Sequence, residues 1–258
     1  MHLCFAANPK RTQTIEVEKR LMRLAQERGF DCSRLSDGGG EGSDILVVIG
    51  GDGSLIHNAG ISCERGLPML GVHFGRVGFL SECREEDFSN ALDLLREGRY
   101  TLDSRRMMAC SINGGAKVHC LNDVLLFKHS FSGVAEMELS IDGEAAGTIF
   151  GDGIVVATPT GATAYSLSAG GPIIADGLDA VVITPICPHT LHMRPIVASC
   201  EAEICLQVKG MGMVAADGTR IAEVHTGDKI MLGSSDKTVS FVRFAKRNLF
   251  FSIQQKLR

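Results

Sequence analysis

A continuous apolar run, ILVVI at residues 45–49, ends directly in a turn of three glycines and one carboxylate, GGDG at residues 50–53. Strands that are buried on both faces of a parallel sheet have uninterrupted apolar runs of this kind. Glycine tolerates positive φ and lets a ligand approach the backbone, and a strand-to-helix turn exposes amides at the positive end of the helix dipole. The pattern therefore predicts an anion-binding turn between a buried strand and a helix.

The first hundred residues repeat this alternation of strand and helix. Apolar runs cover residues 2–7, 44–50 and 68–72, and segments with helical spacing cover residues 12–28, 54–65 and 84–97. Strands that alternate with helices are typical of a parallel α/β sheet. We predict an α/β N-terminal domain with a Rossmann-like parallel sheet over residues 1–100.

The pattern changes after residue 100, where short strand-like runs replace helical periodicity. NGG at residues 113–115 and IDG at residues 141–143 signal hairpin turns, and only residues 164–169 keep a helical pattern. We predict a β-rich C-terminal domain over residues 101–236. The tail, residues 237–258, is expected to pack back on the first domain and complete it through its phenylalanines, Phe241, Phe244, Phe250 and Phe251.

Composition and charge exclude several classes of function. The formal net charge of −4 disfavours a protein that binds nucleic acid through overall basicity. No apolar run approaches the roughly 20 residues that a membrane helix needs. The N-terminal segment has its positive charges after its apolar residues, which is the reverse of a signal peptide. The nine cysteines have no CxxC or zinc-type spacing, which favours a reducing, cytoplasmic location.

Asp52 is the unusual member of the glycine turn, because a carboxylate repels phosphate. The segment is neither a Walker A sequence nor GxGxxG. A kinase reaction explains a carboxylate among phosphate-binding amides, since the carboxylate orients or deprotonates the attacking hydroxyl or holds Mg²⁺. The alternative interpretation is a Gly-Asp-Gly surface turn without a function. The position directly after a buried strand favours the functional interpretation.

Two further stretches place polar groups in apolar surroundings. Residues 151–176, GDGIVVATPTGATAYSLSAGGPIIAD, combine hydroxyl side chains with Tyr165. Such groups hydrogen-bond a ribose or an adenine edge and stack on a base; the alternative is a hydroxyl-rich loop with a capped short helix.

In CLNDVLLF, Asn122 and Asp123 lie inside an apolar strand. Adjacent strand side chains face opposite sides, so at least one is buried or faces a cleft; the alternative is a hydrogen-bonded turn at a strand end.

In order along the chain, GGDG, GRVGFL, LNDV, GDGIVVATPTGATAYSLSAGGPI and ITPICPHTLHMRPIV resemble the NAD kinase family over nearly the whole sequence. The fourth block is specific, whereas GGDG is shared with lipid kinases and phosphofructokinases. The resemblance implies transfer of the terminal phosphate of ATP to the 2′-hydroxyl of the adenosine ribose of NAD, which yields NADP. It also implies a divalent metal, usually Mg²⁺, a homodimer or homotetramer, and an active site between the two domains.

The resemblance also assigns roles to individual residues. Asp52 corresponds to the base or metal-orienting group, and Arg76 and Phe79 lie in a loop near phosphate and substrate. Asn122 and Asp123 correspond to the pair that contacts the NAD nucleoside. Asp152 corresponds to a dinucleotide-site aspartate. The phosphate loop is shaped by Gly50, Gly51 and Gly53, and the adenine- and ribose-contacting positions correspond to Thr158, Thr163, Ala164, Tyr165 and Ser168.

Three positions depart from the family pattern. Ser54, Ala162 and Cys187 stand where threonine, serine and asparagine are commoner. These changes affect individual hydrogen bonds and leave the implied reaction intact.

Three other hypotheses make different predictions. Another GGDG kinase would phosphorylate a lipid or a sugar, and a non-catalytic sensor would bind NAD without turnover. A metalloenzyme would use His189 and His192 beside Cys187, although Pro188 interrupts regular structure there. The metal ligands, the choice between ATP and polyphosphate as donor, and the choice between NAD and NADH as acceptor stay open at this stage.

Overall fold

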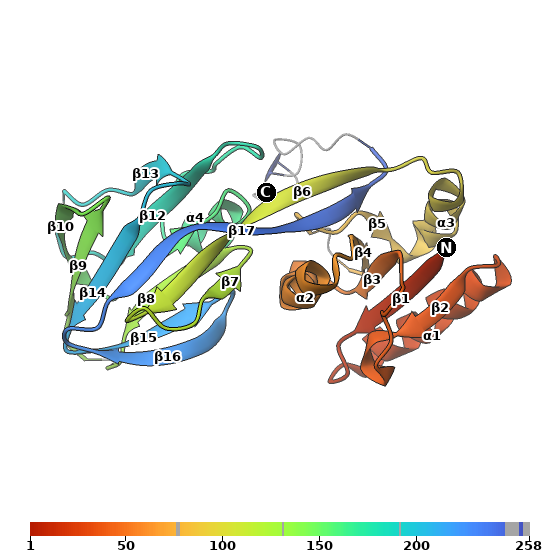
Figure 1. Ribbon diagram of the computed structural model, residues 1–258, viewed down its shortest axis with the longest axis horizontal. Helices are drawn as coiled ribbons and strands as arrows, with labels where there is room; N and C mark the ends of the chain where they lie inside the picture. The colour runs from red at the N-terminus through yellow and green to blue at the C-terminus, as the bar shows by residue number, and fades with distance from the viewer. Residues whose placement is uncertain (76–77, 131, 191, 246–252, 255–258) are drawn as a thin grey trace. The chain divides into compact units, whose positions relative to one another are not determined.

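The computed structural model describes residues 1–75, 78–130, 132–190, 192–245 and 253–254. The chain forms two units (Figure 1). Unit 1 comprises Met1–Arg105 with Thr238–Arg258, and unit 2 comprises Arg106–Lys237. Two long strands, β6 (Thr101–Ile112) and β17 (Ile230–Arg243), run from one unit into the other.

Unit 1 is built on parallel strands that alternate with helices. Its elements are β1 (His2–Ala7), α1 (Thr12–Glu27), β2 (Asp31–Arg34), η1 (Leu35–Asp37), β3 (Ile45–Ile49), α2 (Asp52–Arg65), β4 (Met69–His73), β5 (Cys83–Arg84), η2 (Glu85–Asp87) and α3 (Phe88–Arg96). The parallel strands follow the order β4-β3-β1-β2, and β5 and the end of β17 also pair with β4 in parallel. This arrangement confirms the predicted α/β domain.

The core of unit 1 follows from the apolar patterns. Every residue of β3 and of β4 is buried, as expected for central parallel strands. Helices α1 and α3 pack their apolar faces against one side of the sheet, where Phe88 meets Phe5 edge-to-face with ring centroids 6.3 Å apart. The carboxyl ends of β1, β3 and β4 therefore gather at one edge, where ligands bind in such sheets.

Two predicted helices have different boundaries from those expected. The helix predicted for residues 84–97 begins only at Phe88. Arg84 belongs instead to β5, where it pairs with His73 of β4, and a single 3₁₀ turn follows. The helix predicted from residue 54 begins at Asp52, so that the glycine turn itself enters the helix.

Unit 2 is a β-sandwich with very little helix. Its remaining elements are β7 (Val118–Cys120), β8 (Asp123–Lys128), β9 (Ala135–Ile141), β10 (Glu144–Gly151), β11 (Gly153–Ala157), η3 (Gly161–Thr163), α4 (Tyr165–Ser168), β12 (Ala180–Ile186), β13 (Ile196–Ser199), β14 (Ile204–Lys209), β15 (Met211–Ala216) and β16 (Thr219–His225). One antiparallel sheet has the order β13-β12-β11-β8-β15-β16, and the other contains β10-β9-β14 with β17. Side chains of both sheets form one apolar core, which confirms the predicted β-rich domain.

Hairpin turns join the strands of unit 2 where the sequence predicts them. Asn113 and Gly114 both have positive φ between β6 and β7, and Asp142 and Gly143 do so between β9 and β10. Two consecutive residues with positive φ match the right-handed twist of the flanking strands. In the tail, Phe241 pairs with Met69 of β4 and Phe244 packs on the unit 1 core, whereas Phe250 and Phe251 lie outside the described residues.

Candidate active site

The glycine turn joins β3 to α2. Its first position has a backbone conformation that only glycine adopts without strain. Gly50 has a φ of +143°, and a Cβ atom there would lie 2.2 Å from Ser54 Oγ. Gly51 is the N-cap residue of α2, and both Gly51 and Gly53 are exposed. The first amides of a helix have no partner within it, and the helix dipole adds positive potential there. The turn is therefore suited to hold phosphate oxygens.

Asp52 is the first residue of α2, and its carboxylate is held by a second loop. The amide of Phe79 donates to Asp52 Oδ2 at 2.6 Å, and the amide of Leu80 donates to Oδ1 at 2.9 Å. The loop approaches closely because residue 78 is glycine, where a Cβ atom would lie 1.8 Å from Asp52 Oδ1. Asp52 and Phe79, two of the predicted residues, are thus in direct contact. Arg76 lies outside the described residues.

In unit 2, Asn122 and Asp123 lie at the junction between β7 and β8, and both are buried. They are not alternating residues inside one strand, because β8 begins only at Asp123. The Asn122 side-chain oxygen is buried and has no hydrogen-bond partner in the described part of the chain. Buried polar atoms are nearly always paired, so this oxygen marks a position where a ligand donor fits.

Asp217, a residue that the motif analysis missed, supports this junction. Its carboxylate accepts three backbone N–H groups: Leu121 at 2.7 Å, Asn122 at 2.7 Å and Asp123 at 3.2 Å. Burial raises the pKa of Asp217, and the backbone hydrogen bonds partly offset that rise. Burial, and then the charge of Asp217, raise the pKa of Asp123 to about 6. The only local signal for Asp217 is a DG hairpin turn, which predicts the turn but not its partners.

Thr158 fastens the hydroxyl-rich loop to the same junction. Its hydroxyl donates to the Leu121 carbonyl at 2.6 Å and accepts the Gly161 amide at 3.2 Å. A Cβ atom at Gly161 would lie 2.0 Å from the Asn122 carbonyl oxygen, so this position requires glycine. The loop therefore lies directly against Asn122, and its next residues, Thr163 and Ala164, are partly exposed.

The remaining loop residues include exposed side chains. Tyr165, which is 45% exposed, and Ser168, also exposed, lie on the single turn of α4. Between them Ser166 is fully buried, where its hydroxyl lies 2.9 Å from that of Thr184. The buried pair anchors the turn and leaves the Tyr165 ring available for stacking.

Asp152 does not join the cluster around Asn122. In the register of β8 against β11, Asp123 pairs with Ala157 and Phe127 pairs with Gly153. Asp152 therefore lies at the opposite end of the strand pair, five residues away, or about 17 Å at roughly 3.3 Å per residue. Its carboxylate lies 2.6 Å from Lys128 Nζ. No sequence motif pointed to Lys128 as its partner. The hydrogen bond from Lys128 is the main cause that lowers the pKa of Asp152.

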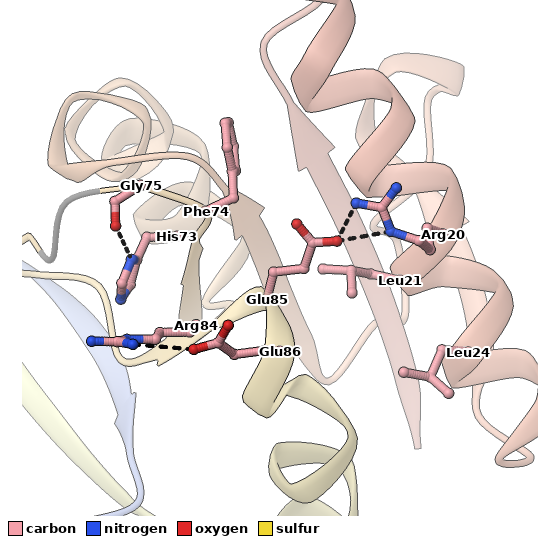
Figure 2. A pocket seen from close by; sticks show the side chains of 9 residues that line it. All are labelled: Arg20, Leu21, Leu24, His73, Phe74, Gly75, Arg84, Glu85 and Glu86. Atoms are coloured by element: carbon pink, nitrogen blue, oxygen red, sulfur yellow. Dashed lines mark hydrogen bonds and ion pairs between the residues drawn. The ribbon is translucent and has the colours of Figure 1, made fainter.

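A pocket of about 520 Å³ lies beside the end of β4 in unit 1 (Figure 2). Its walls include Leu21 and Leu24 of α1 together with Phe74. Two arginines also line it, but each one faces a glutamate, Arg20 with Glu85 and Arg84 with Glu86. The carboxylate partners offset part of the positive charge of these two arginines.

The described ranges of residues contain no group of three or more His, Cys, Asp or Glu side chains arranged to hold a metal ion. They also contain no helix with the length and apolar character needed to cross a membrane. All nine cysteines are free thiols.

A carboxylate beside exposed glycine amides at a helix N-terminus, and a buried polar junction beside an exposed tyrosine, would suit a protein that acts on a phosphorylated nucleoside. Family models of the ATP-NAD kinase N-terminal and C-terminal domains match residues 33–100 and 121–244. A relative from Geotalea daltonii named NAD kinase is 38% identical over 225 residues, which cover 84% of this chain and 79% of the relative. The chain belongs to the NAD kinase family.

Solved structures of two kinases share the fold. An NAD kinase from Archaeoglobus fulgidus in complex with ATP has a TM-score of 0.79 and 25% identity, over 98% of this chain and 98% of its own. Yeast NADH kinase complexed with NADH has a TM-score of 0.89 and 22% identity, over 100% of this chain and 87% of its own. The second likeness concerns the fold alone. Together they agree with the fold predicted from the sequence.

Proposed function

We propose that this protein transfers the terminal phosphate of ATP to the 2′-hydroxyl of the adenosine ribose of NAD, which yields NADP. The observation that carries the proposal is the Asp52 carboxylate, held by two loop amides at the first residue of α2. Membership of the NAD kinase family supports the same reaction. A lipid or a sugar as acceptor is not favoured, because the relatives are NAD kinases.

Asp52 acts as the general base or orienting group in this proposal. In the proposed reaction the carboxylate, held by the two loop amides, accepts the proton of the ribose hydroxyl. The amides fix its rotamer before the substrate arrives. Gly50, Gly51 and Gly53 shape the turn whose amides hold the donor phosphates. Most of the rate acceleration comes from positioning and from neutralised charge.

Unit 2 supplies the nucleoside contacts. The unpartnered oxygen of Asn122 accepts a donor from the nucleoside, and Asp123 accepts a ribose hydroxyl. Tyr165 stacks on the base, and Thr163, Ala164 and Ser168 border the same site. The Thr158 hydroxyl already donates to Leu121, which supports a role in shaping the loop. Asp152 and Lys128 form a separate dinucleotide contact, because the strand register keeps them away from Asn122.

Phe79 and Arg76 complete the proposal in unit 1. The Phe79 ring is partly exposed while its amide holds Asp52, so the ring borders the substrate. Arg76 meets phosphate on the basis of the family resemblance.

The proposed reaction would use Mg²⁺ bound to ATP, with Asp52 as the protein carboxylate that would hold it. Mg²⁺ commonly binds through one or two carboxylates together with substrate phosphates and waters. A single carboxylate in the glycine turn fits this mode. The metal supplies charge neutralisation when bound.

Assembly and location are also part of the proposal. The homodimer or homotetramer rests on the family resemblance alone. The free cysteines support a reducing, cytoplasmic location. Light scattering on the purified protein measures the oligomeric state.

One assay tests the reaction. The purified protein is incubated with NAD, ATP and Mg²⁺, and the product is detected with an NADP-specific dehydrogenase. Parallel reactions replace ATP with polyphosphate and NAD with NADH, diacylglycerol or fructose 6-phosphate. Formation of NADP supports the proposal; phosphorylation of only the lipid or the sugar, or NAD binding without turnover, contradicts it.

A further inference from the structure

Arg243 is a buried charged residue that none of the roles above uses. It is the last residue of β17, and only 3% of its surface is exposed. Because β17 runs parallel to β4 through the pair of Phe241 and Met69, Arg243 lies toward the carboxyl ends of the unit 1 strands. The glycine turn follows β3 at the same edge of the sheet.

The Arg243 guanidinium contacts the loop that holds Asp52. Its Nη1 donates a hydrogen bond of 2.8 Å to the Leu80 carbonyl oxygen. The amide of the same residue, Leu80, donates to Asp52 Oδ1. Leu80 therefore connects the guanidinium to the carboxylate through two successive peptide groups.

Two acids fix the guanidinium in turn. Arg243 Nη1 lies 3.1 Å from Glu82 Oε2, and Nε lies 3.3 Å from Asp103 Oδ2. Burial opposes the ionisation of Asp103, but hydrogen bonds and charge from Arg105, together with the charge of Arg243, hold its pKa below the ordinary value. The rigid fork of a guanidinium can serve both acids and the Leu80 carbonyl at once, which a lysine ammonium cannot do.

Glu82 ties this group to the loop and to the tail. It lies two residues after Leu80, and its Oε1 accepts the Phe244 amide at 2.8 Å. The path of residues 78–82 is thus held from β17, a strand that follows unit 2 in the sequence. The loop that holds Asp52 is therefore supported by a segment of unit 1 that follows unit 2 in the sequence.

We propose that Arg243 is a positioning residue for phosphoryl transfer, which sets the Phe79 and Leu80 amides and through them the Asp52 carboxylate. The inference rests on the proposed role of Asp52. A displacement of a catalytic group by about 1 Å costs on the order of 100-fold in rate, so a loop held loosely slows the chemical step. Of the proposed NAD contacts, those of unit 2 do not depend on this contact. The Phe79 ring, which is proposed to border the substrate, moves with the loop, so a small change in KM for NAD accompanies the loss of kcat.

The experiment compares steady-state kinetics of full-length variants with ATP, NAD and Mg²⁺. Arg243→Met is expected to lower kcat by about 10- to 100-fold and to change KM for NAD by less than about threefold. Arg243→Lys keeps the charge and recovers part of the lost kcat. In an Asp52→Asn background, Arg243→Met is expected to cause a further change of less than about threefold, because the carboxylate that it positions is gone.

Arg34→Met is the matched control. Arg34 Nε lies 3.2 Å from Glu18 Oε2, which is also in unit 1, but β2 is separated from β4 by β3 and β1. Loss of this ion pair lowers stability without touching the loop, so kcat is expected to stay near that of the parent protein. Circular dichroism checks that each variant folds. If Arg243→Met does not fold, Arg243→Lys with and without Asp52→Asn gives the same test.

Three results would overturn the inference: a parental kcat in Arg243→Met, an equal loss of kcat with and without Asp52, or an equal loss in Arg34→Met. The proposed role of Asp52 fails separately, if Asp52→Asn alone keeps its activity. An inactive Asp52→Asn together with a fully active Arg243→Met defeats only the positioning role.

Discussion

The two units each hold a carboxylate at a predicted functional position, and they support it in different ways. In unit 1, backbone amides point at the carboxylate that we propose to be catalytic, Asp52. In unit 2, the amides of Leu121, Asn122 and Asp123 point at a neighbour, Asp217, while burial raises the pKa of Asp123 to about 6. One carboxylate receives its donors from the protein, and the other is placed in an environment that penalises its charge.

Under the proposed function, this difference separates a carboxylate prepared for chemistry from one prepared for binding. A carboxylate fixed by amides keeps one orientation before the substrate arrives, as a base in an in-line reaction requires. A buried carboxylate beside an unpartnered amide oxygen gains hydrogen bonds when a ligand with hydroxyl groups enters. The same residue type therefore serves two purposes according to where the backbone donors point.

The largest effect is expected from Asp52→Asn. The substitution keeps the size of the side chain but removes the proton acceptor, so kcat falls by on the order of 10²–10⁴ while the protein stays folded. Steady-state kinetics with the coupled NADP assay measure this loss. A rate near that of the parent protein would remove Asp52 from the chemistry and erase the contrast between the two carboxylates.

Gly78→Ala tests whether the loop amides matter, with a smaller expected effect. The added methyl group would lie 1.8 Å from Asp52 Oδ1, so the carboxylate or the loop must move. We expect kcat to fall by about 10- to 100-fold with little change in KM for NAD. Gly60→Ala in α2 is the control, because a Cβ atom there meets open space and alanine favours a helix. Equal activity of the two variants would contradict the prediction.

Asp217→Asn tests the support in unit 2. An amide side chain cannot accept all three N–H groups, so KM for NAD is expected to rise several-fold and stability to fall by about 1–3 kcal/mol. Asp142→Asn is the control, since Asp142 occupies the matching position of another hairpin, where its side chain accepts the Glu203 amide at 2.9 Å. Thermal unfolding and kinetics separate the two effects. A stability loss with unchanged KM would reduce Asp217 to a structural residue.

The smallest effect is a pH dependence that originates at Asp123. Its pKa of about 6 in the folded protein lies above the ordinary aspartate value of 3.8, so the folded protein holds this proton more tightly than the unfolded chain. The stability that results is fully present below pH 3.8 and is lost as the pH rises through about 6. A ligand that donates to the ionised form binds more tightly as the pH rises through the same range.

Calorimetric titration with NAD between about pH 5 and pH 7, roughly one unit on each side of that pKa, measures the change in affinity. Asp123→Asn has no titrating carboxyl and is expected to flatten the profile. The prediction fails if the parent protein and the variant show the same pH dependence.

Local structure was predictable because its causes are local. The buried run at residues 45–49 forms β3. Asn113 and Gly114 both have positive φ, as expected because asparagine and glycine are the residues that favour this backbone in hairpin turns. The turn around Asp52 was predictable for the same reason. The start of α3 was not, because Arg84 pairs with β4 and this pairing prevails over helical spacing.

The sequence alone therefore determined the alternation of elements in unit 1, the hairpins of unit 2 and the motifs that identify the family. The tertiary structure decided which distant groups meet. It brought Arg243 to Leu80 across 163 positions and Asp217 to Asn122 across 95, and it kept Asp152 at the far end of β8 from Asp123. Neighbouring side chains dictate backbone conformation, but sheet order and strand register decide contacts between remote segments, and those depend on the whole fold.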